Sequence, residues 1–461
     1  MLNYQQIREH YRLQDRQGSP ASGPRILVIG FAAIILLGTI LLALPAASEG
    51  PGRITWLEAL FTAVSATTVT GLAVVSTETT FSTFGEIVIL FLIQIGGIGF
   101  ITLSVMLFRL IGRRVGIYER ILLSQTLGMG AYRGIVRLTL LVIFITLAIE
   151  FMGALILFIQ WLPLMSWQKA AYFAIFHSVS AFCNAGFDLF HGLDDPLLQA
   201  SRSDPVVLLV LSVLITIGTL GITVIYDLIL WPRERHLSLH TRLILPFTLS
   251  LIIIGTILVM IDEMFVGGHA LSALDTGERW WVAFFTIVSS RTAGITLIPM
   301  NELGPASQMV IFVWMFIGGA PASMGGGVGL STVAVVLVTL VSITRGHDEV
   351  RVLERTLPTE TIYKSVAVLT VSTALVFGVT LLLMLLGEGK EIFPIAFEVI
   401  SAFSNTGYSL GITDQFSNTG RVLLAFTMFW GRLGPLTLVV ALAQRHRRSL
   451  LRYPEEKIII G

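Results

Sequence analysis

Four short stretches rich in serine, threonine, asparagine and alanine each end in a glycine and follow a moderately apolar run. The glycines are Gly71, Gly186, Gly294 and Gly407, at intervals of 115, 108 and 113 residues. So regular a period predicts a fourfold internal repeat. Backbone carbonyls can replace the lost water of a cation without adding net charge, and glycine reaches the dihedral angles that aim successive carbonyls at one point. Four such loops around one axis would form a cation filter.

The candidate ion-binding residues are the ends of these four stretches. Their hydroxyl and amide side chains are expected to hold the loops in shape, although the ordinary turn-forming behaviour of such residues also explains them. Close helix packing is the alternative explanation for the glycines, but it does not account for one glycine at the end of each of four short runs. The predicted filter residues are Thr68, Val69, Thr70 and Gly71; Cys183, Asn184, Ala185 and Gly186; Arg291, Thr292, Ala293 and Gly294; and Ser404, Asn405, Thr406 and Gly407.

A second glycine signature follows each loop inside the next apolar stretch. In the third repeat this signature continues into a run of six glycines and a proline within twelve residues, which no straight helix tolerates. Unwound backbone at membrane depth must face protein or a pore, and small residues suit a segment that moves; a passive kink is the alternative. The candidate gate residues are Gly318, Gly319, Ala320, Pro321, Ala322, Ser323, Met324, Gly325, Gly326 and Gly327, together with Arg432 of the fourth signature.

Arg432 and Arg291 are charged residues inside otherwise apolar repeats. A charge in a membrane interior is costly and usually functional, so Arg432 is expected to face the pore or the carbonyls of the gate segment. A structural ion pair is the alternative. Arg291 lies three residues before Gly294 and is expected to brace the filter from behind. Glu150, a carboxylate in the middle of an apolar block, has no role that the sequence decides.

Composition and block lengths indicate the elements that would position these loops. The chain is 54% apolar and 13% charged. Long apolar blocks suit helices that cross about 30 Å of hydrocarbon, and shorter runs before each glycine loop suit half-helices that enter and return. The long blocks are 26–45, 136–161, 206–231, 243–261 and 366–386, with 87–111, 308–342 and 420–444 broken by glycine; the short runs are about 55–67, 167–182, 278–290 and 392–404.

The predicted fold is therefore an all-α membrane protein. Four span–half-helix–loop–span repeats would surround a pseudo-fourfold central pore, with eight full transmembrane helices. The half-helix carboxyl ends would carry partial negative charge toward the pore and favour a cation. We expect a cytoplasmic amino-terminal tail (1–24), the first repeat (25–112), a cytoplasmic loop with the second repeat (113–232), the third repeat with the gate segment (233–343), a cytoplasmic loop with the fourth repeat (344–445) and a cytoplasmic carboxyl-terminal tail (446–461).

Charge distribution predicts the orientation. With eight spans, 22 of the 30 basic residues lie on the side that holds both termini, and basic loops stay in the cytoplasm. A multi-pass protein of the cell membrane with cytoplasmic termini is thus predicted. The opposite loops are acidic, which would concentrate cations at the pore mouth, although any non-cytoplasmic loop has few basic residues. The acidic residues include Asp188, Asp194, Asp195, Asp204, Asp262, Glu263, Asp275 and Glu278.

At these residues the chain resembles the Trk/Ktr/HKT superfamily of potassium transporters, and within it the KtrB-type membrane subunits. The resemblance extends from about residue 24 to the carboxyl terminus, and the chain starts directly with the first repeat. It rests on Thr68-Val69-Thr70-Gly71-Leu72, Phe182-Cys183-Asn184-Ala185-Gly186-Phe187, Arg291-Thr292-Ala293-Gly294, Ser404-Asn405-Thr406-Gly407-Tyr408 and Gly431-Arg432-Leu433-Gly434-Pro435.

The resemblance implies a potassium-translocating subunit of a potassium uptake system, often with sodium as activator or coupling ion. Sodium-selective plant relatives tend to carry serine where this chain has Gly71, so the pattern favours potassium. It also implies that the segment from Gly318 to Gly327 is a gate beneath the filter, that two chains form a homodimer, and that a cytoplasmic KtrA-like ring of nucleotide-binding subunits regulates transport.

Several other functions find little support in the sequence. One cysteine excludes an intrachain disulfide, and no zinc spacing, nucleophile–base arrangement or organic cofactor motif is present. We therefore expect that the chain is not an enzyme, that it binds no nucleic acid and that membrane lipid surrounds it. A sodium or non-selective monovalent cation channel of the same fold is the alternative. A secondary transporter is less well supported, because those proteins commonly show two large inverted repeats rather than four copies in one orientation. The apolar tail Lys457–Gly461 is a candidate dimer contact.

Overall fold

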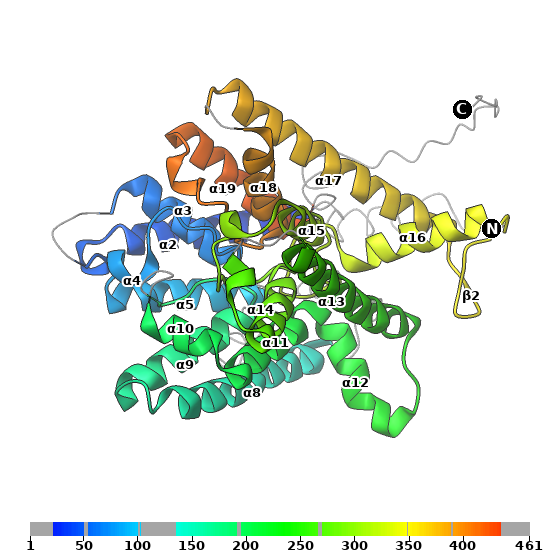
Figure 1. Cartoon of the computed structure of the whole chain (residues 1–461). Coiled ribbons are helices and arrows are strands. Elements are labelled where there is room, and N and C mark those ends of the chain that lie inside the picture. Colours follow the sequence, from blue (N-terminus) through cyan, green and yellow to red (C-terminus); the bar gives the residue numbers. More distant parts are fainter. Residues whose placement is uncertain are drawn as a thin grey trace, which may run out of the picture.

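The computed structural model describes residues 22–49, 54–99, 102, 135–190, 195–265, 270–347, 349–388 and 391–434. Four consecutive groups of helices surround a common centre (Figure 1). The groups consist of α2 (Ser22–Leu42), α3 (Trp56–Thr67), α4 (Thr77–Thr80) and α5 (Thr83–Ile98); α8 (Ile135–Trp161), α9 (Trp167–Phe182), α10 (Pro196–Arg202), α11 (Pro205–Leu220) and α12 (Ile222–Glu234); α13 (Leu239–Phe265), α14 (Thr276–Ser289), α15 (Pro305–Phe316) and α16 (Leu330–Thr344); and α17 (Thr359–Leu385), α18 (Ile392–Ser404) and α19 (Asn418–Leu433).

Short 3-10 turns and one small hairpin complete the described structure. The 3-10 turns are Pro45–Ala47, Ala270–Ala273, Met300–Glu302 and Thr413–Gln415. The strands β1 (Arg351–Val352) and β2 (Arg355–Thr356) pair antiparallel between α16 and α17. Helices therefore make up nearly all of the regular structure in the described part of the chain, as the all-α prediction requires.

The four predicted half-helices are α3, α9, α14 and α18. Each is apolar, spans 12 to 16 residues and ends within two residues of the start of a filter stretch. A capping box starts α3, because the Thr55 side chain accepts from the Glu58 N–H while Glu58 accepts from the Thr55 N–H. At one register each half-helix carries a fully buried phenylalanine, which anchors it in the core. These are Phe61, Phe176, Phe285 and Phe397.

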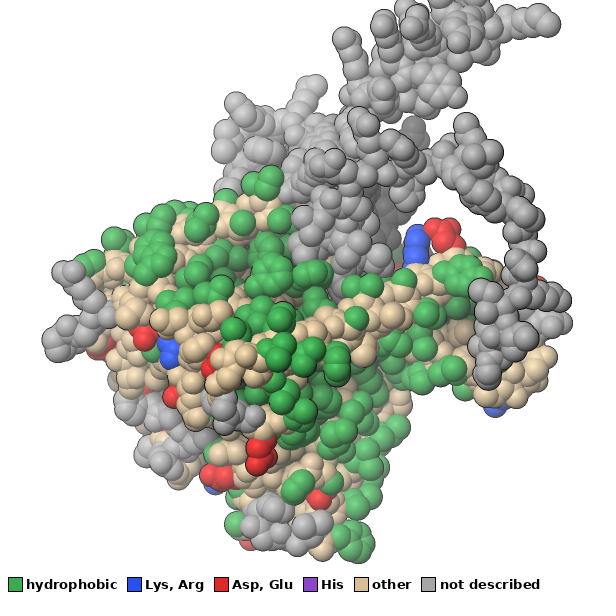
Figure 2. Space-filling view, turned by 90° about the horizontal axis from the view of Figure 1, so that it is seen from above, with side chains coloured by type: hydrophobic (Ala, Val, Ile, Leu, Met, Phe, Trp, Pro, Cys, Tyr) green, Lys and Arg blue, Asp and Glu red, His purple; other side chains and the backbone are tan. Residues whose placement is uncertain are grey.

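Three of the described helices are long and apolar enough to cross a membrane by themselves: Thr139–Trp161 of α8, Leu239–Phe265 and Thr359–Leu385. Their outward faces carry large exposed apolar side chains, such as Phe144 (69% exposed) and Phe377 (71%). Figure 2 shows many hydrophobic side chains and few charged ones on one face of the molecule. A surface of this kind suits lipid, since soluble proteins rarely expose large contiguous apolar patches.

The prediction of a continuous helix over 206–231 is wrong. The chain forms α11 and α12, bent by 101° at Gly221, which has φ of +80°. The helices α5 and α19 likewise end at positive-φ glycines, Gly99 and Gly434, and α15 ends at Phe316 just before the third signature. In repeats 1, 2 and 4 a signature glycine with positive φ thus ends the helical hydrogen-bond pattern, whereas in repeat 3 the helix ends just before Ile317 without such a glycine.

Several predicted segments lie outside the described residues. They are 1–21 of the amino-terminal tail, nearly all of the loop after α5 up to α8, the ends of the stretches expected to reach 111 and 444, and the carboxyl-terminal tail 446–461. The short helix α10 lies between the second filter stretch and α11, and this connection is described from residue 195 onward.

Candidate ion filter and gate

The four filter stretches have the same backbone conformation. In each stretch the glycine has a positive φ, and so does the residue two positions before it. A positive φ is rare for residues with a side chain, so its recurrence at one register in all four loops reflects a shared geometry. The pairs are Val69 (φ 52°) and Gly71 (83°), Asn184 (57°) and Gly186 (68°), Thr292 (85°) and Gly294 (67°), and Asn405 (53°) and Gly407 (94°).

The four glycines form a closed ring. A β-carbon added to Gly71 would lie 2.5 Å from the carbonyl oxygen of Ala185, which directly precedes the next filter glycine. The other three glycines approach their neighbours even more closely. In order round the ring, the glycine–carbonyl pairs are Gly71–Ala185, Gly186–Ala293, Gly294–Thr406 and Gly407–Thr70. Repeats 1 and 3 therefore lie opposite each other, as do repeats 2 and 4, and the structure brings all four predicted loops together.

Polar side chains of the filter stretches bond to one another and to the half-helices. Within repeat 1, the hydroxyls of Thr68 and Thr70 lie 2.7 Å apart, and Thr68 donates to the Val64 carbonyl. Between repeats, the Asn405 amide donates to the Thr70 hydroxyl at 2.8 Å. On the opposite side, the Asn184 amide lies 3.2 Å from the Thr292 hydroxyl. These bonds give the polar side chains a scaffolding role.

A serine from each of three half-helices bonds the backbone of the filter glycine or of the residue directly after it. The Ser180 hydroxyl donates to the Phe187 carbonyl at 2.6 Å, and Ser289 donates to Ile295 at 3.0 Å. In repeat 4 the direction reverses, because the Gly407 N–H donates to the Ser401 hydroxyl at 3.0 Å. These serines stand at one register in three repeats and tie the half-helix to the end of the filter stretch, whereas the Ser65 hydroxyl at the same register of repeat 1 has no hydrogen-bond partner among the described residues.

In repeats 1, 2 and 4 the glycine signature that follows the filter stretch allows two helices to pack closely. A β-carbon on Gly96 would lie less than 2.5 Å from the Thr67 carbonyl at the end of its half-helix. Gly218 and Gly431 make the equivalent approach to Phe182 and Phe403. Small residues at these three positions let the second helix of the repeat touch the carboxyl end of the half-helix, as the packing explanation predicts for membrane helices.

The predicted gate segment is an irregular loop, Ile317–Gly329, between α15 and α16. Its backbone hydrogen-bonds to the glycine signature of repeat 2. The Ala320 N–H donates to the Thr219 carbonyl at 2.9 Å, and the Met324 N–H donates to the Gly218 carbonyl at 3.0 Å. Its middle lies against the filter residues. A β-carbon on Gly325 would lie 2.6 Å from the Thr292 hydroxyl, and Gly326 and Gly327 make similar approaches to Asn405 and Ser404.

The Arg432 guanidinium links this loop to repeat 1. It donates to the carbonyls of Met324 and Gly96, and to that of Gly97 at 3.2 Å. Among the described residues the Arg432 side chain forms no ion pair, the alternative considered above, because all of its hydrogen bonds go to backbone carbonyls. A cation held only by carbonyls beneath a filter would repel a second cation from the same place.

Arg291, the predicted brace of the filter, is buried. Its side chain is 2% exposed, and its Nε and Nη2 atoms have no hydrogen-bond partner among the described residues.

Glu150, by contrast, is well bonded: Gln94 donates to both carboxylate oxygens at 3.2 and 3.0 Å, and the Cys183 thiol lies 3.7 Å from one of them. Cys183 in turn packs against Gly97. Glu150 thus supports the end of α9 behind the second filter stretch.

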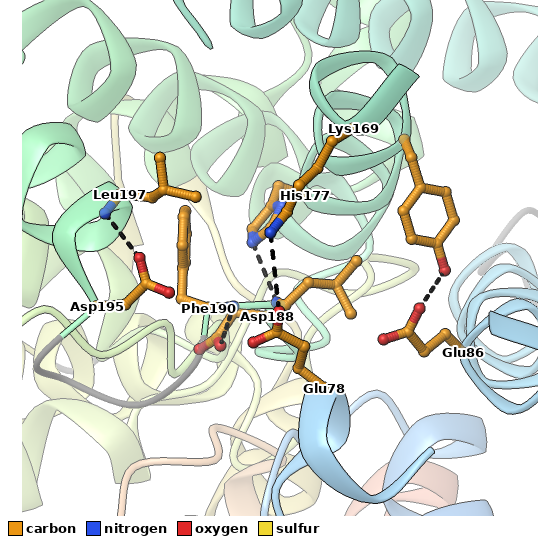
Figure 3. Close-up of polar contacts among 10 residues, drawn as sticks. Glu78, Glu86, Lys169, His177, Asp188, Phe190, Asp195 and Leu197 are labelled. Atoms are coloured by element: carbon orange, nitrogen blue, oxygen red, sulfur yellow. Dashed lines mark hydrogen bonds and ion pairs between the residues drawn. The ribbon is translucent and has the colours of Figure 1, made fainter. Parts of the chain in front are cut away.

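The acidic outer loops serve partly structural ends. Asp262 accepts from the N–H and hydroxyl of Ser307, and Glu263 accepts from the Gly304 N–H, so both are buried carboxylates at the start of α15. Asp188, Asp195, Glu78, Glu86 and Lys169 lie in one region beside α9 (Figure 3), where Glu86 accepts from the Tyr172 hydroxyl at 2.6 Å. The ion pair of Lys169 with Glu78 is loose, at 4.0 Å.

Sequence comparison decides the family. The family model TrkH, described as "Cation transport protein", matches residues 25–450. The chain belongs to the TrkH family of cation transport proteins. The resemblance to Trk and Ktr transporters is thereby confirmed, as is the expectation that this TrkH-family chain is a transporter and not an enzyme.

Named relatives cover almost the whole chain. Ktr system potassium uptake protein B of Bacillus subtilis is 36% identical over 438 residues, 95% of this chain and 96% of that protein. The potassium/sodium uptake protein NtpJ of Enterococcus hirae is 32% identical, over 95% of this chain and 97% of that protein. Among solved structures, the potassium transporter TrkH from Vibrio parahaemolyticus aligns with a TM-score of 0.72 at 18% identity, covering 93% of this chain and 86% of that one.

Sequence reasoning gave no role to two residues that hold the candidate filter loops of this TrkH-family chain. Tyr408 crosses from repeat 4 to repeat 3, where its hydroxyl donates to the carbonyls of Thr286 and Ile295 at 3.1 and 3.3 Å. Glu398, fully buried in α18, accepts from the Ser409 hydroxyl and the Leu410 N–H at 2.6 and 2.9 Å. A charged residue inside an apolar half-helix was the available signal for Glu398.

Proposed function

We propose that the chain is the potassium-translocating membrane subunit of a potassium uptake system of the Ktr type. The observation that carries the proposal is the closed ring in which each filter glycine touches the carbonyl that precedes the next one. Such a ring brings carbonyl oxygens from four sides to one axis, which suits a dehydrated monovalent cation. The names of the Bacillus subtilis and Vibrio alginolyticus relatives, both potassium uptake proteins, favour potassium as the transported ion.

The half-helices and the gate complete the mechanism. The carboxyl ends of α3, α9, α14 and α18 precede the ring, so their partial negative charges stabilise a cation at its inner side. Below the ring, the loop Ile317–Gly329 and Arg432 close the path at rest. Transport requires this loop to move aside, which its glycines permit but which breaks the backbone hydrogen bonds that Ala320 and Met324 make to repeat 2.

The surrounding assembly follows from the same proposal. Eight membrane crossings would place both termini in the cytoplasm of the cell, with the pore repeats divided at residues 25, 113, 233 and 344. Two chains would form a homodimer, and a cytoplasmic KtrA-like ring of nucleotide-binding subunits would act on the gate. Sodium would serve as activator or coupling ion.

A sodium or non-selective monovalent cation channel is the second candidate. The relative NtpJ, named a potassium/sodium uptake protein, favours it. Purified chain in liposomes separates the two candidates when rubidium-86 and sodium-22 uptake are measured in competition with unlabelled potassium and sodium. Potassium-preferring uptake supports the proposal, equal competition by both ions supports the alternative, and the absence of any cation flux through correctly folded chain contradicts both.

A further inference from the structure

Two half-helices carry a titratable residue where the other two carry threonine. The position directly follows the buried phenylalanine of each half-helix. In chain order it holds Thr62, His177, Thr286 and Glu398, all 3% exposed or less. Because neighbours in the glycine ring follow the order of the repeats, His177 and Glu398 approach the filter from opposite sides.

The His177 ring is held as a neutral imidazole of one tautomer. Its Nδ1 atom lies 2.7 Å from the Phe173 carbonyl, and its Nε2 atom lies 3.4 Å from the Leu189 N–H. A carbonyl can only accept and a backbone N–H can only donate, so Nδ1 carries the hydrogen and Nε2 accepts. Leu189 lies three residues after Gly186, on the strand that leaves the filter.

Glu398 performs the same task in repeat 4. Its Oε1 atom accepts from the N–H of Leu410, which lies three residues after Gly407, at 2.9 Å. Its second oxygen accepts from the Thr413 hydroxyl at 2.7 Å. Two chemically different acceptors at one register therefore bind the N–H of the same position in two opposite repeats. Core packing alone requires neither acceptor, since the other two repeats carry the smaller Thr62 and Thr286 at this register.

We propose that His177 and Glu398 are positioning residues. They hold the extended segments that follow Gly186 and Gly407 and so keep filter stretches 2 and 4 in their ion-selecting shape. The inference rests on the proposed cation-selective function of the ring. The bonded N–H groups, of Leu189 and Leu410, lie only three residues after the filter glycines. Loss of either hydrogen bond would therefore let the segment shift and move the carbonyls that face the ion. The two residues touch no ion and act through the backbone.

A consequence for acid follows from the His177 tautomer. Protonation adds a hydrogen to Nε2, which would then face the Leu189 N–H donor to donor, and the bond would be lost. The rings packed around His177 are apolar or aromatic, with centroids at 4.8 Å for Phe190 and 5.2 Å for Trp161. The charged groups on the elements around it are Lys169 of α9, Asp188 of the strand, Glu78 of α4 and Asp195 before α10 (Figure 3).

The test compares His177→Leu, His177→Gln and wild type in liposomes that hold the full chain. The ratio of potassium to sodium flux is measured while the external pH falls from about 8 to about 4, a range wide enough to protonate a histidine that is fully buried. Leucine fills the space but accepts no bond, so we expect the ratio at pH 8 to fall at least about threefold, as the loss of one buried bond predicts. Glutamine offers an acceptor that does not titrate, so its ratio should stay close to wild type at pH 8 and should change less in acid.

Controls separate this inference from the proposed function. His236→Gln changes an exposed histidine before α13 and should leave both the ratio and its pH profile as in wild type. If wild type itself shows no preference for potassium, the proposed function fails. If wild type selects potassium but His177→Leu keeps the same ratio, or if His177→Gln follows the wild-type pH profile, the positioning role is refuted. The glutamine profile decides the matter even if the leucine variant does not fold.

Discussion

Replacing Gly294 by alanine tests whether the ring of close contacts shapes the pore. Gly294 has φ of +67°, and a β-carbon there would lie well inside 3 Å of the Thr406 carbonyl oxygen, closer than at Gly71. Two costs follow. The left-handed backbone conformation costs a residue with a side chain roughly 1–2 kcal/mol. The overlap also forces the Thr406 carbonyl away from its place in the ring.

The second cost determines selectivity. Real β-carbons essentially never approach an oxygen below 3.0 Å, so the carbonyl must retreat by more than about 0.5 Å. A contact between a carbonyl and a charged group contributes about 1.5–3 kcal/mol, and losing roughly half of one such contact for the better-fitting ion weakens discrimination by about 1 kcal/mol. A difference of 1.4 kcal/mol corresponds to about tenfold. We therefore expect the potassium-to-sodium flux ratio to fall about five- to tenfold.

Gly411→Ala is the matched control. Gly411 has φ of +80°, but nothing lies within 4 Å of an added β-carbon, so this variant carries the backbone cost without the overlap. Both variants are purified, checked for a monodisperse folded state, and measured for rubidium-86 and sodium-22 uptake in liposomes. Gly411→Ala should keep the wild-type ratio. Equal ratios in wild type and Gly294→Ala, or equal losses in the two variants, would refute the reasoning.

Four further predictions concern the gate and the scaffold. Arg432→Gln should raise potassium flux without regulators several-fold, because three carbonyls lose their charged donor; unchanged flux speaks against a gate. Deletion of 320–328 should raise the same basal flux, whereas wild-type flux would favour a passive kink. Tyr408→Phe should lower the stability of the detergent-solubilised chain by about 1 kcal/mol, seen as a lower melting temperature, since the bonds to Thr286 and Ile295 vanish. Glu150→Ala should lower stability by about 1–3 kcal/mol and leave Gln94 without its partner, while Glu150→Gln should lose less; equal losses would contradict the hydrogen-bond account.

Sequence periodicity predicted the elements around the filter well. The runs expected at 167–182 and 392–404 coincide with α9 and α18, and the long helices α8, α13 and α17 stand where apolar blocks predicted them. These predictions succeeded because the length of an apolar run reports how much chain lies at membrane depth. The family was equally accessible, because its motifs recur at all four filter loops.

The arrangement of the second helices was harder to predict. The block 206–231 is apolar throughout, and hydropathy alone does not reveal the 101° bend at Gly221. The bend arises where Ile222 and the loop residue Ala322 meet through a backbone hydrogen bond at 3.2 Å, a contact between segments a hundred residues apart. Likewise, Asp262 and Glu263 suggested an acidic mouth, but Ser307 and Gly304 from a distant segment bind them in the interior. Contacts of this kind have no local signature in the sequence.

The most direct measurement locates the ion itself. Crystals or vitrified particles of the chain prepared with thallium or rubidium in place of potassium would reveal the heavy ion by its anomalous signal or density. We expect the ion on the axis of the four loops, within reach of the carbonyls of Thr70, Ala185, Ala293 and Thr406 that touch the ring glycines. Heavy ions found only in the acidic outer loops, with the centre of the ring empty at saturating concentration, would contradict the account.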